Sequence, residues 1–246
     1  SFNGTNYRGY FKVVRNSSQL LLINYVDIED YVKGVILKEM PLDDGQKNFE
    51  ALKAFAILSR TYALEKKNNC SEKFDSHADT RDQVYGGLSA ENKITNKLVD
   101  LTKGQVLFFD KKIAKVFYHS TCGGYTENVE NVFKSEPLPY LISLRDGIKT
   151  NCLISPRFNW DESFSEQLII KRLIDSKYIS NKNSKLKEIK VKSRYKSGRV
   201  NELKIIVQEN KELKEISLFS NNIRYVLRNS NGSILPSTNF EIEISR

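Results

Sequence analysis

The chain lacks any hydrophobic run long enough to cross a membrane. Its apolar stretches, such as Leu20–Ile23 and Val106–Phe109, fall far short of the roughly 20 residues that a membrane-spanning helix needs. Cysteine is also scarce, with three residues in 246. Three cysteines cannot all pair within one chain, and their spacing fits neither a disulfide framework nor a CxxC metal site. The length and the 39% of hydrophobic residues are instead enough for a buried core.

Acidic residues are outnumbered by basic ones, which gives a net charge of +9. A basic surface favours three classes of partner: nucleic acid, an anionic membrane, or an anionic polymer such as a cell wall. No zinc finger, basic zipper or RNA-recognition signature is present, so nucleic acid is only a remote alternative. We expect no nucleic-acid partner.

The first part of the chain changes from a strand period to a helix period. Phe11–Val14 and Leu20–Val26 alternate as two short strands around a turn. Asp27 is suited to cap a helix, which Pro41 must end. Glu39 then lies in the last turn, where the helix carbonyls carry a partial negative charge. This position favours the neutral, protonated form of its carboxyl group.

Periodicity also predicts the remaining elements. Helices are expected at Gly45–Lys67, Ile94–Leu101 and Phe164–Asp175. Strands are expected at Val106–Phe109, Ala114–Tyr118, Leu186–Lys192, Val200–Gln208, Lys214–Phe219 and Phe240–Ile244. Between these elements, residues 119–127 form a loop with two adjacent glycines, which lets backbone N–H groups approach a ligand closely.

Short motifs follow one another in a fixed order along about residues 10–245. They are Tyr31-Val32-Lys33-Gly34-Val35, Lys38-Glu39-Met40-Pro41, Ser59-Arg60-Thr61-Tyr62-Ala63, Gln83-Val84-Tyr85-Gly86-Gly87 and Tyr118-His119-Ser120 with Gly123-Gly124-Tyr125-Thr126. This ordered set resembles the stage II sporulation protein D (SpoIID/LytB) family. The resemblance implies a lytic transglycosylase that remodels septal peptidoglycan during engulfment in sporulation. It also implies glycan strands stripped of stem peptides as substrate and a membrane-anchored amidase/endopeptidase as partner.

Glu39 matches the catalytic glutamate of that family. Most glycosidases need two carboxylates. A lytic transglycosylase needs one, because the C6 hydroxyl of N-acetylmuramic acid (MurNAc) attacks and closes a 1,6-anhydro ring. One glutamate protonates the oxygen of the bond to N-acetylglucosamine (GlcNAc) and then accepts the C6 proton. LytB members of the family are described as amidase enhancers, so a non-catalytic cell-wall binder is the alternative function.

Other side chains and backbone groups are candidates for holding the glycan. The predicted substrate-binding residues are Lys53, Arg60, Tyr62, Gln83, Tyr85, His119, Ser120, Gly123, Gly124, Tyr125 and Thr126. Cations bind carboxylates, tyrosines stack on sugar rings, and a glycine loop exposes amides. A structural ion pair for Arg60 and core packing for the tyrosines are the alternatives. We disfavour Cys122 as a nucleophile, because no Asp or Asn is placed to orient His119.

A metal is possible but disfavoured. Some members of the resembling family carry cysteine and histidine before the Gln-x-Tyr-Gly motif, where they are linked to zinc. Here that stretch contains only His77 among such ligands. Cys70, His77, His119 and Cys122 would make a Cys₂His₂ set, but the spacing from Cys70 to His77 lies outside common patterns. We therefore expect no cofactor.

The expected fold is α+β, with a helical core that carries Glu39 and β-rich lobes that flank a substrate cleft. We expect one domain over residues 1–246, which can divide into lobes of about 1–150 and about 151–246. The expected location is extracytoplasmic, with a membrane tether supplied by an N-terminal segment that this chain does not contain.

Overall fold

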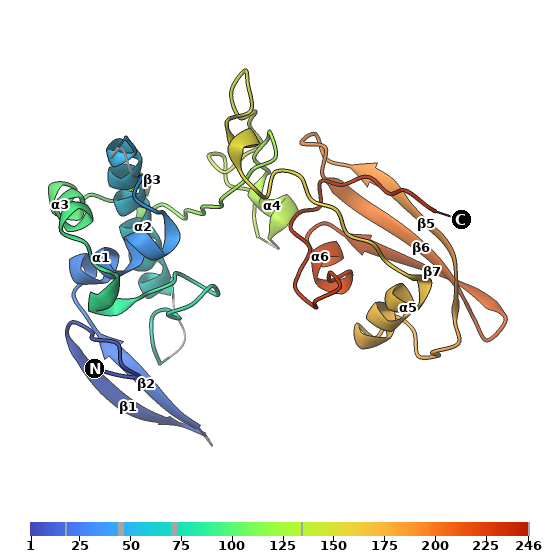
Figure 1. The fold of residues 1–246 in the computed structure, drawn as a ribbon, viewed down its shortest axis with the longest axis horizontal. Coiled ribbons are helices and arrows are strands. Elements are labelled where there is room, and N and C mark those ends of the chain that lie inside the picture. The colour runs from blue at the N-terminus through green and yellow to red at the C-terminus, as the bar shows by residue number, and fades with distance from the viewer. Residues whose placement is uncertain (18, 44–46, 70–72, 134, 246) are drawn as a thin grey trace. The chain divides into compact units, whose positions relative to one another are not determined.

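A computed structural model describes residues 1–246 except 18, 44–46, 70–72, 134 and 246. The chain divides into two compact units, Ser1–Tyr118 and His119–Arg246. Both units contain helices and strands, which confirms the predicted α+β class (Figure 1). Among the described residues, no helix combines the length and the apolar character that spanning a membrane requires.

The first unit combines a β-hairpin with three helices. Its elements are β1 (Tyr10–Asn16), β2 (Gln19–Tyr25), α1 (Ile28–Glu39), α2 (Phe49–Asn69), the 3₁₀ helix η1 (Gly87–Ala90), α3 (Lys93–Leu101), β3 (Phe108–Phe109) and β4 (Lys112–Ile113). The strands β1 and β2 pair antiparallel, and so do β3 and β4. The predicted first hairpin and the predicted helices are therefore present, although Gly45, the predicted start of the second helix, lies outside the described residues.

Helix α1 begins and ends where the sequence predicts. The side chain of Asp27 accepts a hydrogen bond from the backbone N–H of Glu29, at 2.9 Å, and so satisfies a free amide of the first turn. At the other end Met40 leaves the helical conformation while its N–H still bonds to Ile36 O, at 2.8 Å. Pro41 follows and cannot continue the helix, so Glu39 is the last helical residue.

One apolar core holds the three helices of the first unit together. Its buried residues come from α1, α2 and α3 and are Val32, Ile36, Leu52, Phe55, Ala56, Leu98 and Val99. They recur at three- and four-residue steps, so each helix presents one apolar stripe to the other two. This packing fixes the end of α1 against α2, and thereby fixes Glu39.

Gly34 is the point where α1 approaches Tyr85 most closely. A Cβ atom there would lie 2.4 Å from Tyr85 Cε2 and 3.2 Å from the carbonyl oxygen of Gly87. The Tyr85 ring already contacts Tyr31, with centroids 5.1 Å apart, so it has little room to withdraw. Gly34 is therefore required by packing.

Gly34→Ala is expected to lower the free energy of unfolding by about 1–3 kcal/mol, because it overpacks this contact. Urea denaturation followed by far-UV circular dichroism measures the change. The matched variant carries Gly34→Ala together with Tyr85→Leu, which removes the clashing ring atoms. If the double variant is no more stable than the sum of the two single changes predicts, overpacking against Tyr85 is not the cause.

The second unit is built on a three-stranded sheet. Its elements are α4 (Val129–Val132), the 3₁₀ helix η2 (Asn151–Ile154), α5 (Glu166–Asp175), β5 (Lys185–Arg194), β6 (Val200–Glu209), β7 (Glu212–Phe219) and α6 (Asn222–Val226). The strand order is β5-β6-β7, and each neighbouring pair is antiparallel. Figure 1 shows α5 and α6 against one face of this sheet.

Alternation along the central strand explains that arrangement. Leu203, Ile205 and Val207 of β6 are fully buried, while the residues between them are partly exposed. They share one core with Leu173 of α5 and Ile223 of α6. The sheet therefore has one buried face, which the two helices cover.

Two predicted strands are wrong, and the loop before residue 150 groups with the sheet. Residues 114–118 and 240–244 are not strands, because no neighbouring strand pairs with them in the part of the chain that the structure describes. The boundary that we predicted near residue 150 falls inside the second unit, which begins at His119. The reason is that Arg199 donates hydrogen bonds to Cys122 O, at 2.5 Å, and Tyr125 O, at 3.0 Å, and so ties the loop to the sheet.

Candidate functional site

The carboxyl group of Glu39 is half-buried at the end of α1. Its Oε1 accepts a hydrogen bond from the backbone N–H of Val84, at 2.6 Å. This bond offsets the unfavourable position of a carboxylate beside the last helix carbonyls. No described residue donates a hydrogen bond to its Oε2. Glu39 is thus held by one oxygen, and the other is available to a ligand.

Gln83, which precedes Val84, is fully buried and anchors this segment. Its side-chain amide donates to Ser59 Oγ, at 3.0 Å, and its Oε1 accepts from the hydroxyl of Tyr31, at 3.3 Å. Ser59 lies on α2 and Tyr31 on α1. Gln83 therefore ties the Val84 segment to both helices, and it positions the Glu39 partner instead of offering its own amide to solvent.

The hydroxyl of Tyr118 is buried without a hydrogen-bond partner among the described residues. Its ring packs edge-on against Phe55, with centroids 5.0 Å apart. Burial raises the pKa of Tyr118 to about 12, and the charge of Glu39 acts in the same direction. Burial also raises the pKa of Tyr31, and Tyr118, Asp82 and Glu39 act in the same direction. Both phenols stay protonated near neutral pH, so Tyr118 is a free donor within electrostatic reach of Glu39.

A buried carboxylate lies behind these tyrosines. The side chain of Asp82 is 2% exposed and accepts hydrogen bonds from Tyr62 Oη, at 3.0 Å, and from the N–H of His77, at 2.8 Å. It also pairs with Lys66 Nζ, at 2.8 Å. Burial alone would raise the pKa of Asp82, but these partners together hold it below its usual range. Asp82 therefore stays ionised and holds Tyr62 in place, and it is unsuited to act as a second acid in catalysis.

Arg60 points into the protein and is 1% exposed. Its guanidinium group makes a bidentate pair with Glu29, at 3.0 and 2.6 Å, and donates to Gln105 O, at 2.9 Å. Glu29 also accepts from the N–H of Gly104, at 3.0 Å. These contacts join α1, α2 and the 102–105 turn. They favour the structural ion pair, the alternative to the predicted substrate-binding role.

Lys53 and Tyr85 also differ from the arrangement that we expected. Lys53 is directed to Glu50 on the same helix, with Nζ 2.8 Å from both carboxylate oxygens. Tyr85 is 8% exposed and packs against Tyr31 and Tyr7. This packing of its ring in the core favours the alternative that we gave for the tyrosines. Lys53 and Arg60 lie seven residues apart on α2 but have different surroundings: the Lys53 side chain is partly exposed, and Arg60 is buried.

The predicted glycine-loop residues belong to the second unit. His119 and Ser120 are exposed, and Gly123 and Gly124 have φ angles of +67° and +102° that other residues rarely adopt. Farther along the loop, Thr126 N–H bonds to Leu144 O, at 2.9 Å. This loop belongs to the second unit, whereas the Glu39 cluster belongs to the first.

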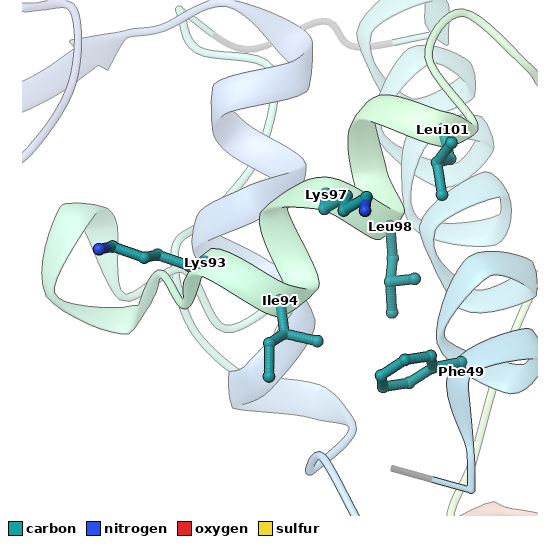
Figure 2. Close-up of a pocket in the computed structure, with 6 residues that line it drawn as sticks. All are labelled: Phe49, Lys93, Ile94, Lys97, Leu98 and Leu101. Atoms are coloured by element: carbon teal, nitrogen blue, oxygen red, sulfur yellow. The ribbon is translucent and has the colours of Figure 1, made fainter.

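Two further features bear on ligand binding. Of the residues that we considered as zinc ligands and disfavoured, Cys70 lies outside the described residues, and the ring of His77 packs edge-on against Phe74, with centroids 4.8 Å apart. A hollow of about 400 Å³ between α2 and α3 is mostly apolar, and Figure 2 shows its lining. Its lining residues are Phe49, Lys93, Ile94, Lys97, Leu98 and Leu101. None of these is a predicted site residue, and the hollow offers no carboxylate for acid catalysis.

Several residues of the Glu39 cluster are not among the predicted site residues. Glu39, Gln83 and Tyr62 of this cluster were predicted from the sequence. The residues that were not predicted are Tyr31, Ser59, Val84 and Tyr118. All four of these residues lie inside the quoted motifs, and three of them are next to predicted site residues. Their position in a motif was the only available signal, because periodicity does not show which neighbours converge.

Part of this chain is similar in sequence to known proteins. Residues 16–109 match the model of a family described as "SpoIID: Stage II sporulation protein". The chain is 36% identical over 143 residues to an uncharacterized protein of Brachyspira hyodysenteriae, covering 57% of this chain and 38% of that protein. It is 36% identical over 144 residues to the "Amidase enhancer" of Bacillus subtilis, covering 58% and 18%. It is 35% identical over 140 residues to "Stage II sporulation protein D" of Bacillus amyloliquefaciens, covering 50% and 39%. The chain thus spans less than two fifths of each of these relatives.

Proposed function

We propose that this chain, whose residues 16–109 match the SpoIID family model, is a lytic transglycosylase with Glu39 as catalytic acid and base. Its substrate is the MurNAc–GlcNAc bond of peptidoglycan glycan strands, and its product ends are 1,6-anhydroMurNAc. The observation that supports this most is the Glu39 carboxyl group, held through Oε1 by Val84 N–H while no described residue donates to Oε2. The name of one relative, "Stage II sporulation protein D", supports a role in sporulation.

The reaction needs a single proton carrier. Protonated Glu39 gives its proton to the glycosidic oxygen as the bond to the sugar C1 breaks. The C6 hydroxyl of the same sugar then attacks C1, and the Glu39 carboxylate takes the hydroxyl proton. No water is consumed, and the glutamate returns to its starting form. Asp82 is unsuited to act as a second carboxylate, because its charge is already committed to Lys66 and Tyr62.

Tyr118 has a positioning role in this proposal. A buried hydroxyl without a partner costs free energy, and a bound sugar oxygen or Oε2 of Glu39 would satisfy it. The hydrogen bond from Tyr31 to Gln83 keeps Tyr31 in place within the same cluster. Arg60 and Gln83 act indirectly, by fixing the helices and the Val84 segment.

Wild-type protein should convert peptide-stripped glycan strands into fragments with 1,6-anhydro ends, which mass spectrometry detects as a loss of one water relative to hydrolysed ends. Intact, peptide-bearing sacculi are the comparison substrate. The absence of anhydro ends from both substrates would refute the transglycosylase function. Fragments with reducing ends instead would indicate a hydrolase.

One relative favours a second candidate, a non-catalytic cell-wall binder that stimulates an amidase. That relative is named "Amidase enhancer" and is 36% identical over 144 residues. In this case the chain added to an amidase should increase release of stem peptides, and Glu39→Gln should increase it equally. An extracytoplasmic location, a membrane tether and an amidase/endopeptidase partner are part of the proposal for the lytic transglycosylase.

Tyr118→Phe is expected to lower kcat/KM on glycan by about tenfold, since one hydrogen bond to the substrate or to Glu39 is lost. The same variant should be as stable as wild type or slightly more stable, because it removes a buried, unpaired hydroxyl group. Thermal melts and initial rates on the same samples separate these two effects. Loss of stability with full activity would show that the hydroxyl serves only the fold.

A further inference from the structure

Two cysteines of the second unit lie in contact. Cys122 directly precedes the Gly123–Gly124 pair, and Cys152 lies in η2, 30 residues later. Their Sγ atoms are 3.5 Å apart. Both are free thiols, Cys122 buried and Cys152 partly exposed. Their spacing in the sequence gave no sign of this pairing.

Asp146 holds the two cysteines in this arrangement. Its Oδ2 accepts from the thiol of Cys122 and from the backbone N–H of Cys152, both at 3.3 Å. Its Oδ1 accepts from the side-chain amide of Asn151, at 2.9 Å, and its own N–H donates to Gly124 O, at 2.9 Å. These hydrogen bonds hold the pKa of Asp146 below its usual range. One carboxylate thus aligns both segments that carry the thiols.

A metal ion and a covalent bond are the two uses of such a group, and the surroundings favour the bond. The cluster offers one ligand atom each from Cys122, Asp146 and Cys152, whereas a structural zinc site uses four protein ligands. The guanidinium group of Arg199 lies close enough to interact with both thiols and donates to Cys122 O. This cation opposes a second positive charge. Burial also raises the pKa of Cys122 to about 11, so its thiol keeps the proton that a metal must displace.

We propose that Cys122 and Cys152 form an intrachain disulfide that fastens the Gly123–Gly124 loop to η2. The oxidant is a small-molecule or protein disulfide. The more accessible Cys152 attacks it and releases one thiol, which leaves a mixed disulfide on Cys152. The Cys122 thiol gives up its proton to solvent base, and its thiolate then attacks Cys152 Sγ and releases the second thiol. The chain loses two hydrogens and two electrons, and the oxidant becomes two thiols.

The disulfide would close a loop of 30 residues that contains α4. Such closure stabilises a fold mainly by restricting the unfolded chain. It would also limit the motion of His119 and Ser120, which lie just before Cys122. This inference does not depend on the proposed reaction, because it rests on the contacts of the two thiols alone.

The test oxidises the whole chain with glutathione disulfide and compares it with the reduced chain. A Cys70→Ser background leaves only the proposed pair. The oxidised sample should lose the mass of two hydrogens, and a non-reducing digest should contain the linked Cys122 and Cys152 peptides. Its thermal midpoint should exceed that of the reduced sample by about 5–10 °C. Cys152→Ser in the same background is the matched control and should show neither change.

Two outcomes would overturn the inference. One is a chain that stops at the glutathione adduct of Cys152 without closing the internal bond. The other is a reduced Cys70→Ser chain that binds one equivalent of zinc tightly and then resists oxidation, which would assign the cluster to a metal. Both measurements keep Cys122 and Cys152 unchanged, so neither depends on whether a variant at these two positions folds.

Discussion

Glu39→Gln is expected to lower the rate at which 1,6-anhydro ends form by about 10²–10⁴-fold, the usual contribution of one general acid–base group. Glutamine has the same shape, and its carbonyl oxygen can still accept the hydrogen bond from Val84 N–H. It cannot give a proton to the glycosidic oxygen or take one from the C6 hydroxyl. The loss should therefore appear in kcat, with little change in KM or in the melting curve.

The matched control is Glu50→Gln, the same chemical change at an exposed site on α2. Glu50 is 84% exposed in its side chain and pairs only with Lys53, so its variant should retain wild-type rates. If Glu39→Gln produces as many anhydro ends as wild type, Glu39 is not the acid. If wild type itself produces none, the proposed reaction fails before the role of Glu39 is addressed.

Arg60→Ala is expected to destabilise the first unit by about 3–5 kcal/mol, because it leaves the buried Glu29 without its counter-charge. The carbonyl of Gln105 also loses its donor. Far-UV circular dichroism in urea should follow this loss. The single tryptophan, Trp160, belongs to the second unit, so its fluorescence should report that unit separately.

A double variant, Arg60→Met with Glu29→Gln, should recover part of the lost stability. It removes both charges while the glutamine oxygen can still accept from Gly104 N–H. Lys53→Ala is the control for an exposed pair and should change stability by less than about 1 kcal/mol. If Arg60→Ala is as stable as this control and loses glycan affinity, the substrate-binding role would replace the structural one.

Local sequence predicted the elements whose formation depends on neighbours along the chain. Asp27 and Pro41 set the limits of α1, because capping and the missing N–H of proline act within one turn. Alternation over Val200–Gln208 predicted β6 to within one residue. The predicted strand at Phe240–Ile244 failed, because a strand also needs a partner and a hydrophobic pattern does not supply one.

The candidate site divides in the same way. Ordered motifs selected Glu39, and helix geometry placed it at the end of α1. The direction of Arg60, buried against Glu29, was not predictable, because a seven-residue spacing assigns a helix face but not what that face meets. The free hydroxyl of Tyr118 was also beyond reach of the sequence, since it depends on how α2 and Gln83 surround it.

Residue patterns alone predict the α+β class, the ends of α1, the strands of the sheet, and Glu39 as the candidate acid. The folded chain adds which polar groups are satisfied, where the chain divides after Tyr118, and that Cys122 and Cys152 are in contact. The physical reason is range: caps, breakers and periodicity act over a few residues, whereas burial and side-chain pairing join segments that are tens of residues apart.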